Sequence, residues 1–153
     1  MKRYFSFCLL GLSLIVALLA ACGGMPALPP TPTGPTAVGP VTDYATFVSA
    51  LQAAGATVVS GGTVQQPFFT PIGQVAKVNG IDMQVFEFQD AASAKAAAQL
   101  VAKDGGSVGT SMVDWVAPPH FYGAGKIIVL YVGSDANVKA ALNSALGSQF
   151  AGR

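Results

Sequence analysis

Cysteine is almost absent from this sequence. The only two cysteines, Cys8 and Cys22, lie within the first 22 of 153 residues, and residues 23–153 contain none. Disulfide bonds and metal sites with thiolate ligands are therefore excluded for residues 23–153.

Titratable side chains are also scarce, since charged residues make up 10% of the chain and His120 is the single histidine. A catalytic triad would combine His120 with Asp114 and a serine such as Ser111, but no GxSxG motif is present. The carboxylates Asp82 and Glu87 are expected on opposite faces of one strand, and no cluster of histidine, cysteine or acidic residues has the spacing of metal ligands. We therefore expect that the protein is not an enzyme and that it binds neither a cofactor nor a metal.

Positive charge is too sparse for nucleic-acid binding. Of the eight lysines and arginines, Lys2 and Arg3 lie at the N-terminus, which leaves six against seven acidic residues in the rest of the chain. Those six form no basic patch in the sequence, so a nucleic-acid partner is excluded.

The N-terminal residues have the layout of a secretory signal peptide. Lys2 and Arg3 precede an apolar run, 5–21, that only two serines and one glycine interrupt, and small residues end it. The alternative is an uncleaved membrane anchor, which needs about 20 apolar residues. The run is slightly shorter, and no basic stop-transfer cluster follows it. We therefore expect residues 1–21 to be a cleaved signal peptide.

The end of this run, Leu19-Ala20-Ala21-Cys22, resembles the lipobox of bacterial lipoproteins. The resemblance implies a diacylglyceryl group on the Cys22 thiol, cleavage before Cys22, and usually acylation of the new amine. Two or three acyl chains give a stable membrane anchor, whereas one binds reversibly. The expected location is outside the cytoplasmic membrane. Gly23 in place of aspartate resembles the pattern exported to the outer membrane where the host has two membranes; otherwise we expect the cell surface.

Residues 22–40 are expected to form the lipidated cysteine and a tether. Six of the ten prolines and four glycines lie between 23 and 40, a composition that disfavours helices and central strands. With polyproline II character at about 3.1 Å per residue, the tether would extend roughly 50 Å. This length would hold a domain clear of the lipid headgroups.

Residues 41–153 are expected to form a single domain with three helices. Thr42 or Asp43 can cap the first helix, which Gly55 ends. Asp90 can cap an alanine-rich helix over 91–103, and Ser134 or Asp135 can cap a third helix that ends at Gly147.

Strands are expected between these helices. Asn79-Gly80 between apolar runs favours a two-residue type I′ turn that pairs residues 73–78 with 81–88. The run 126–132 is apolar on both faces, which indicates a central strand, and a further strand is expected around 57–59.

A 45-residue offset aligns two parts of this pattern. It places Asn79-Gly80 on Ala124-Gly125 and Asp90 on Asp135, so turn, strand and helix cap coincide. This indicates a repeated ββα unit. We predict an α+β fold, a two-layer sandwich in which an antiparallel sheet carries the helices on one face. The other face is expected to be partly open, or covered by a loop or by the first helix.

Two aromatic segments are the candidate ligand-binding residues. Tryptophan and tyrosine combine a large apolar body with one polar group, which suits recognition. We hypothesise that both segments line one surface, with His120 as a hydrogen-bonding group; the alternative is that the rings close one end of the core. The candidate residues are Phe68, Phe69, Trp115, His120, Phe121 and Tyr122.

The expected function is that of a noncatalytic, lipid-anchored binding or interaction domain, whose partner is an unknown small molecule or envelope protein. The membrane is a partner through the lipid on Cys22. The alternative is a structural or assembly lipoprotein that docks an envelope partner. A concave pocket would favour the first function and a flat surface the second.

Overall fold

The computed structural model describes residues 39–153. The expected signal peptide, the lipobox with Cys22, and nearly all of the tether lie outside the described residues. Within them, no helix is long and apolar enough to cross a membrane. The elements are, in chain order, α1 (Tyr44–Ala53), β1 (Val58–Val64), β2 (Gly73–Val78), β3 (Ile81–Glu87), α2 (Ala91–Gln99), β4 (Ser107–Val108), β5 (Ser111–Met112), β6 (Pro119–Ala124), β7 (Ile127–Val132), α3 (Ala136–Leu146) and β8 (Ala151–Gly152).

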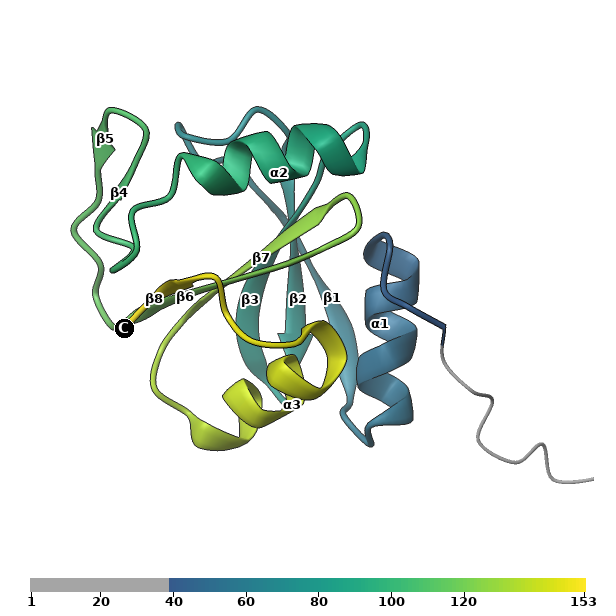
Figure 1. Cartoon of the computed structure of the whole chain (residues 1–153). Helices are drawn as coiled ribbons and strands as arrows, with labels where there is room; N and C mark the ends of the chain where they lie inside the picture. Colours follow the sequence, from purple (N-terminus) through teal and green to yellow (C-terminus); the bar gives the residue numbers. More distant parts are fainter. Residues whose placement is uncertain (1–38) are drawn as a thin grey trace, which may run out of the picture. The chain divides into compact units, whose positions relative to one another are not determined.

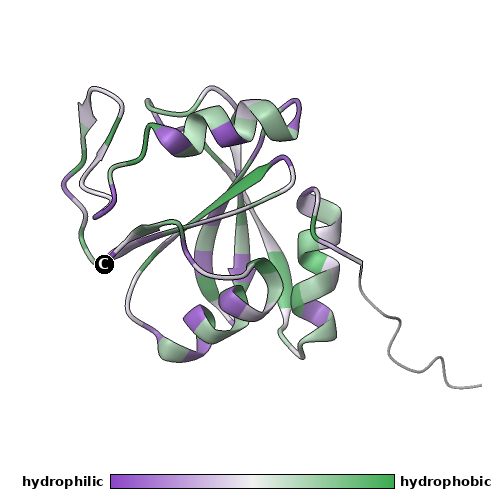
Figure 2. Ribbon diagram, in the orientation of Figure 1, coloured by the Kyte–Doolittle hydropathy of each residue, from purple (hydrophilic) through white to green (hydrophobic). Residues whose placement is uncertain are grey.

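Six strands form one antiparallel sheet in the order β1-β2-β3-β7-β6-β8, and β4 pairs with β5 in a separate short hairpin (Figure 1). The strand β7 lies between β3 and β6, which confirms that 126–132 contains a central strand. Figure 2 shows most of this strand in the hydrophobic colour. A strand with two sheet neighbours and two covered faces has no position for a polar side chain.

The turn between β2 and β3 is the predicted two-residue turn. Val78 pairs with Ile81, and the two residues between them have positive φ, 52° at Asn79 and 84° at Gly80. Asn79 also joins the turn to the residue before β1, because its side-chain oxygen accepts a hydrogen bond from the Thr57 amide at 2.9 Å. The type I′ prediction is confirmed.

Replacing Gly80 with valine should lower the free energy of unfolding by about 1–2 kcal/mol, because a β-branched residue resists positive φ. A Cβ at this position would meet no atom within 4 Å, so the cost comes from the backbone alone. Urea unfolding measures the change, with Asn79→Gly as a control that keeps a residue suited to positive φ. Equal stability of the Gly80→Val variant and the wild type would contradict this account of the turn.

Aspartate side chains cap all three helices. Asp43 accepts a hydrogen bond from the Thr46 amide, and Asp90 accepts one from the Ser93 amide. These backbone hydrogen bonds are the main reason that the pKa of each carboxyl lies below its ordinary value. Asp135 caps α3 through the amides of the two residues after Ala136.

The alanine-rich helix is shorter than predicted. α2 ends at Gln99 instead of Lys103. Val101, in the expected last turn, instead forms an isolated antiparallel bridge with Val108. Helix propensity alone therefore does not set this boundary, because pairing with the β4 strand overrides it.

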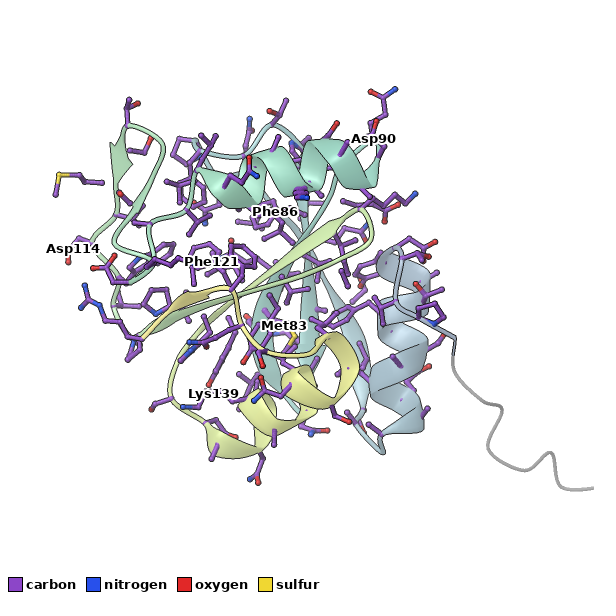
Figure 3. All side chains as sticks on the ribbon, viewed as in Figure 1. Met83, Phe86, Asp90, Asp114, Phe121 and Lys139 are labelled. Atoms are coloured by element: carbon purple, nitrogen blue, oxygen red, sulfur yellow. The ribbon has the colours of Figure 1, made fainter. Side chains whose placement is uncertain are left out.

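The sheet buries a hydrophobic cluster on each face. Helices α1 and α3 cover the first face, where Phe47 and Leu142 pack on Met83, Val85 and Val129. Helix α2 covers part of the second face together with the segments around Phe69 and Trp115. The second cluster contains Phe69, Phe86, Val101, Val108, Phe121, Ile128, Leu130 and Ala151. Figure 3 shows Met83 on the side of α3, and Phe86 and Phe121 on the side of α2.

The α+β fold with an antiparallel sheet is therefore confirmed, while the placement of all helices on one face is wrong. The ββα order does recur as β2-β3-α2 and β6-β7-α3. Phe86 and Tyr131 occupy equivalent positions 45 residues apart, yet Phe86 pairs with Ile128, an odd number of residues from Tyr131. The two rings consequently point to opposite faces, and each repeat places its helix on the face of its own ring.

Candidate functional site

Four of the six predicted aromatic site residues meet on the second face of the sheet. Phe68 lies 6.2 Å from Trp115 and 5.0 Å from Phe69 between ring centroids, and Trp115 lies 6.0 Å from Phe121. The structure thus brings together the two segments around Phe68 and Trp115, which are far apart in sequence.

These four rings are packed against one another and offer little free surface. Phe121 is fully buried and Phe69 nearly so, while Trp115 and Phe68 are half-buried at the edge of the cluster. The indole Nε1 of Trp115 donates a 2.7 Å hydrogen bond to the Gly105 carbonyl, so its polar group is used within the domain. The contacts match a packed core.

His120 and Tyr122 lie on the opposite face, because side chains alternate along β6. Tyr122 belongs to the cluster under α1 and α3. Burial raises the pKa of its hydroxyl, with a smaller contribution from nearby Tyr131. The His120 ring stacks on Tyr131 at 5.7 Å between centroids. The six candidate residues therefore do not form one surface, and this part of the hypothesis is wrong.

Both ring nitrogens of His120 have partners within the domain. Nε2 lies 3.0 Å from the Gly133 carbonyl, which can only accept, so Nε2 carries a hydrogen. Nδ1 lies 2.6 Å from Oε1 of Gln149. His120 is 2% exposed and links β6 to the β7–α3 loop and to the C-terminal segment. His120 does not form a catalytic triad with Ser111 and Asp114, because neither residue contacts either ring nitrogen of His120.

A groove on the second face lies between α2 and the end of the β6–β7 hairpin, with a volume of about 660 Å³. We call it the lysine groove. Its base includes the buried side chains of Ala94 and Ile128 and the half-buried side chains of Ala98 and Phe150. The exposed residues Lys95, on α2, and Lys103, after it, also line it. The helix contributes one stripe of residues spaced by three and four: Ala91, Ala94, Lys95, Ala98 and Gln99.

The neighbouring stripe of α2 lines a second groove of about 650 Å³, which we call the Phe88 groove. Ala96 and Leu100 line it from the helix, and Glu87 and Phe88 from the end of β3. No lysine or arginine is among its lining residues in the described part of the chain. The two grooves are thus similar in size and differ in charge.

None of the six aromatic candidates lines either groove. Among residues 39–153 no group of three or more histidine, cysteine or acidic residues could hold a metal ion. The sequence did contain one signal for the lysine groove: small side chains at Ala91, Ala94 and Ala98 leave space on one stripe of a helix whose only charged residue is Lys95. The position of the β6–β7 hairpin opposite this stripe could not be inferred from the sequence.

No family model matches the chain, and neither its sequence nor its fold has a significant match among curated proteins or solved structures.

Proposed function

We propose that this protein is a noncatalytic, lipid-anchored binding protein outside the cytoplasmic membrane, and that the lysine groove holds its ligand. The observation that carries the proposal is the groove itself, a concave surface of about 660 Å³ with an apolar base and two lysines. Small-molecule sites are typically concave, mostly apolar, and supplied with a few polar groups, at volumes of about 300–1,000 Å³. The lipobox resemblance of residues 19–22 supports the anchor.

The proposed absence of catalysis is supported by the surroundings of His120. Its two ring nitrogens lie within hydrogen-bonding distance of Gln149 and Gly133, so neither is directed at a free nucleophile. A general base must reach the proton that it removes.

A neutral fluorescent probe tests the groove. N-phenyl-1-naphthylamine should bind residues 23–153 saturably, with a blue shift and an increase in emission. The packed core runs from Val41 to Ala151, so this chain keeps the whole domain. Ala91→Trp, at an exposed position of the lysine groove, should weaken binding about tenfold.

Ala96→Trp is the matched control, because Ala96 is exposed on the same helix but lines the Phe88 groove. Its affinity should stay within about twofold of the wild type. Equal weakening by both variants, or no saturable binding to the wild type, would contradict the proposed site.

The anchor has its own test. Cys22→Ser should abolish acyl modification and processing and move the protein out of the fraction anchored by lipid, because the thiol is the attachment point that the lipobox resemblance implies. Mass spectrometry of the N-terminal peptide measures this directly. An intact, unmodified Met1–Cys22 segment in the wild type would refute the anchor while leaving the groove untouched.

One observation favours a second function, the docking of an envelope partner. The segment that carries the β4–β5 hairpin exposes Met112 and Val116 at 91% and 100%. Large apolar side chains exposed to this degree are typical of contact surfaces. A photocrosslinker at Met112 should then give one discrete envelope product, and a crosslinker at Val59, exposed on β1 at the sheet edge, should not.

A further inference from the structure

We infer that the ligand of the lysine groove is an anionic amphiphile, with an apolar chain along the base and a carboxylate or phosphate group held by Lys95 and Lys103. This inference rests on the proposed function of the groove. It follows from the ion-pair pattern of the described residues and from the contrast between the two grooves.

Six basic residues lie in the described part of the chain, and three of them have acidic partners. The three ion pairs are Lys77–Asp82, Lys126–Glu87 and Arg153–Asp104. Within residues 39–153 the other three, Lys95, Lys103 and Lys139, form no ion pair. Two of these three lysines line the same groove.

The acidic residues nearest to Lys95 and Lys103 in the sequence already have partners within the domain. Asp104 follows Lys103 directly, but its carboxylate accepts a hydrogen bond from the Gly106 amide at 2.9 Å and lies 3.4 Å from Arg153. Asp90, at the start of α2, caps the helix through the Ser93 amide. No acidic residue lines the lysine groove within the described chain. The local charge is therefore positive and lacks a counter-charge from the protein, which favours an anion.

The base of the groove selects the other half of the ligand. The exposed side chain of Ala91 and the half-buried side chains of Ala98 and Phe150 offer apolar surface to the groove, beside the buried Ala94 and Ile128. An alkyl chain on this surface gains about 25 cal/mol for each Å² of apolar area removed from water. The Phe88 groove offers similar space, but its one charged lining residue is Glu87, so it should not prefer anions.

Decanoate, decyl phosphate and decanol test the inference, because they have the same length of alkyl chain and different head groups. Each is measured in competition with N-phenyl-1-naphthylamine on residues 23–153. Decanoate or decyl phosphate should bind at least about threefold more tightly than decanol. The Lys95→Gln/Lys103→Gln double variant should lose about tenfold in affinity for the anion and keep its affinity for decanol, because exposed charge pairs are each worth up to about 1 kcal/mol. Lys139→Gln, an unpaired lysine on α3, is the matched control and should change neither affinity.

The anion that binds more tightly identifies the head group. Equal affinities for decanoate, decyl phosphate and decanol, unaffected by the double variant, would overturn the anionic ligand and leave the groove as a neutral site. Failure of the probe itself to bind would instead remove the proposed function.

Two other results, each of which points to a different occupant of the groove, would also overturn the inference. Binding to phosphatidylglycerol vesicles but not to phosphatidylcholine vesicles, without competition by decanoate, would assign the lysines to a membrane surface. Tighter decanoate binding by residues 39–153 than by residues 23–153 would identify the proline-rich segment as the occupant. The comparison of these two chains is needed because Thr42, close to the proline-rich segment, lies near the groove. Its carbonyl accepts a hydrogen bond from the Lys126 amide, and Lys126 is next to the groove residue Gly125.

Discussion

Replacing His120 with alanine should lower the free energy of unfolding by about 3 kcal/mol, with no direct loss of ligand affinity. The variant removes the hydrogen bond from Nε2 to the Gly133 carbonyl and the contact between Nδ1 and Gln149. It also removes a ring stacked 5.7 Å from Tyr131. The carbonyl and the amide would then lie unpaired beside a cavity, which is more costly than losing the bonds alone.

Urea unfolding of His120→Ala, Gln149→Ala and the double variant measures this loss. The two single changes should not add, since they remove the same contact, and a coupling energy of about 1 kcal/mol is expected. Binding of N-phenyl-1-naphthylamine, measured well below the melting temperature, should be unchanged. An unchanged melting temperature together with lost binding would make His120 a ligand-binding residue.

The residues of β6 show which parts of the site could be predicted from sequence. The buried Phe121 fits the alternative interpretation, in which the aromatic rings close the core, and the meeting of the segments around Phe68 and Trp115 was predicted. The placement of His120 and Phe121 on opposite faces of the sheet was not predicted, because a short sequence of this kind can form either an exposed loop or a buried strand. Only the pairing of His120 with Tyr131 in the sheet register fixes which side chains face which layer.

Local features were predictable because their causes lie within a few residues. The Asn79-Gly80 turn follows from two backbone angles, and the Asp90 cap from one side chain and one amide. The face on which α2 packs depends instead on cross-strand register, which adjacent residues do not encode. The short strands β4, β5 and β8 have two residues each, too few for a periodic signal.

The lysine groove is one of the features that depend on the arrangement of the whole sheet. Ala91 and Lys95 are visible in the sequence as part of an alanine-rich helix, but the opposing wall comes from the end of the β6–β7 hairpin and from Phe150. Those segments reach α2 only because β7 lies at the centre of the sheet and β8 pairs with β6. The groove is therefore a product of strand order, and strand order was not predictable here.

Replacing Gly152 with alanine should lower the free energy of unfolding by about 4 kcal/mol, or detach β8 from the sheet. Gly152 has a φ of +124°, and a Cβ there would overlap the Pro119 carbonyl oxygen and lie 2.9 Å from Cα of His120. Because both neighbours are backbone atoms of a paired strand, they cannot move aside as a flexible side chain would. Gly152 is also the residue paired with His120 in the sheet.

Gly62→Ala is the matched control for this variant. Gly62 lies on the opposite edge strand with a φ of +100°, and a Cβ there would meet no atom within 4 Å. It should lose only the backbone cost of about 1–2 kcal/mol. Similar losses at the two positions, measured by urea unfolding, would show that the overlap with Pro119 is relieved without disturbing β8.

The change at Gly152 should also reach the lysine groove, which connects the stability of β8 to the proposed site. The Gly152 amide donates a 2.9 Å hydrogen bond to the Lys103 carbonyl, and Phe150, two residues earlier, lines the groove with Lys103. Displacing β8 would move both lining residues at once. N-phenyl-1-naphthylamine affinity should therefore fall at least about threefold in Gly152→Ala and stay unchanged in Gly62→Ala. Full affinity in Gly152→Ala despite a large loss of stability would show that the groove does not depend on β8, and that α2 and the β6–β7 hairpin suffice to form it.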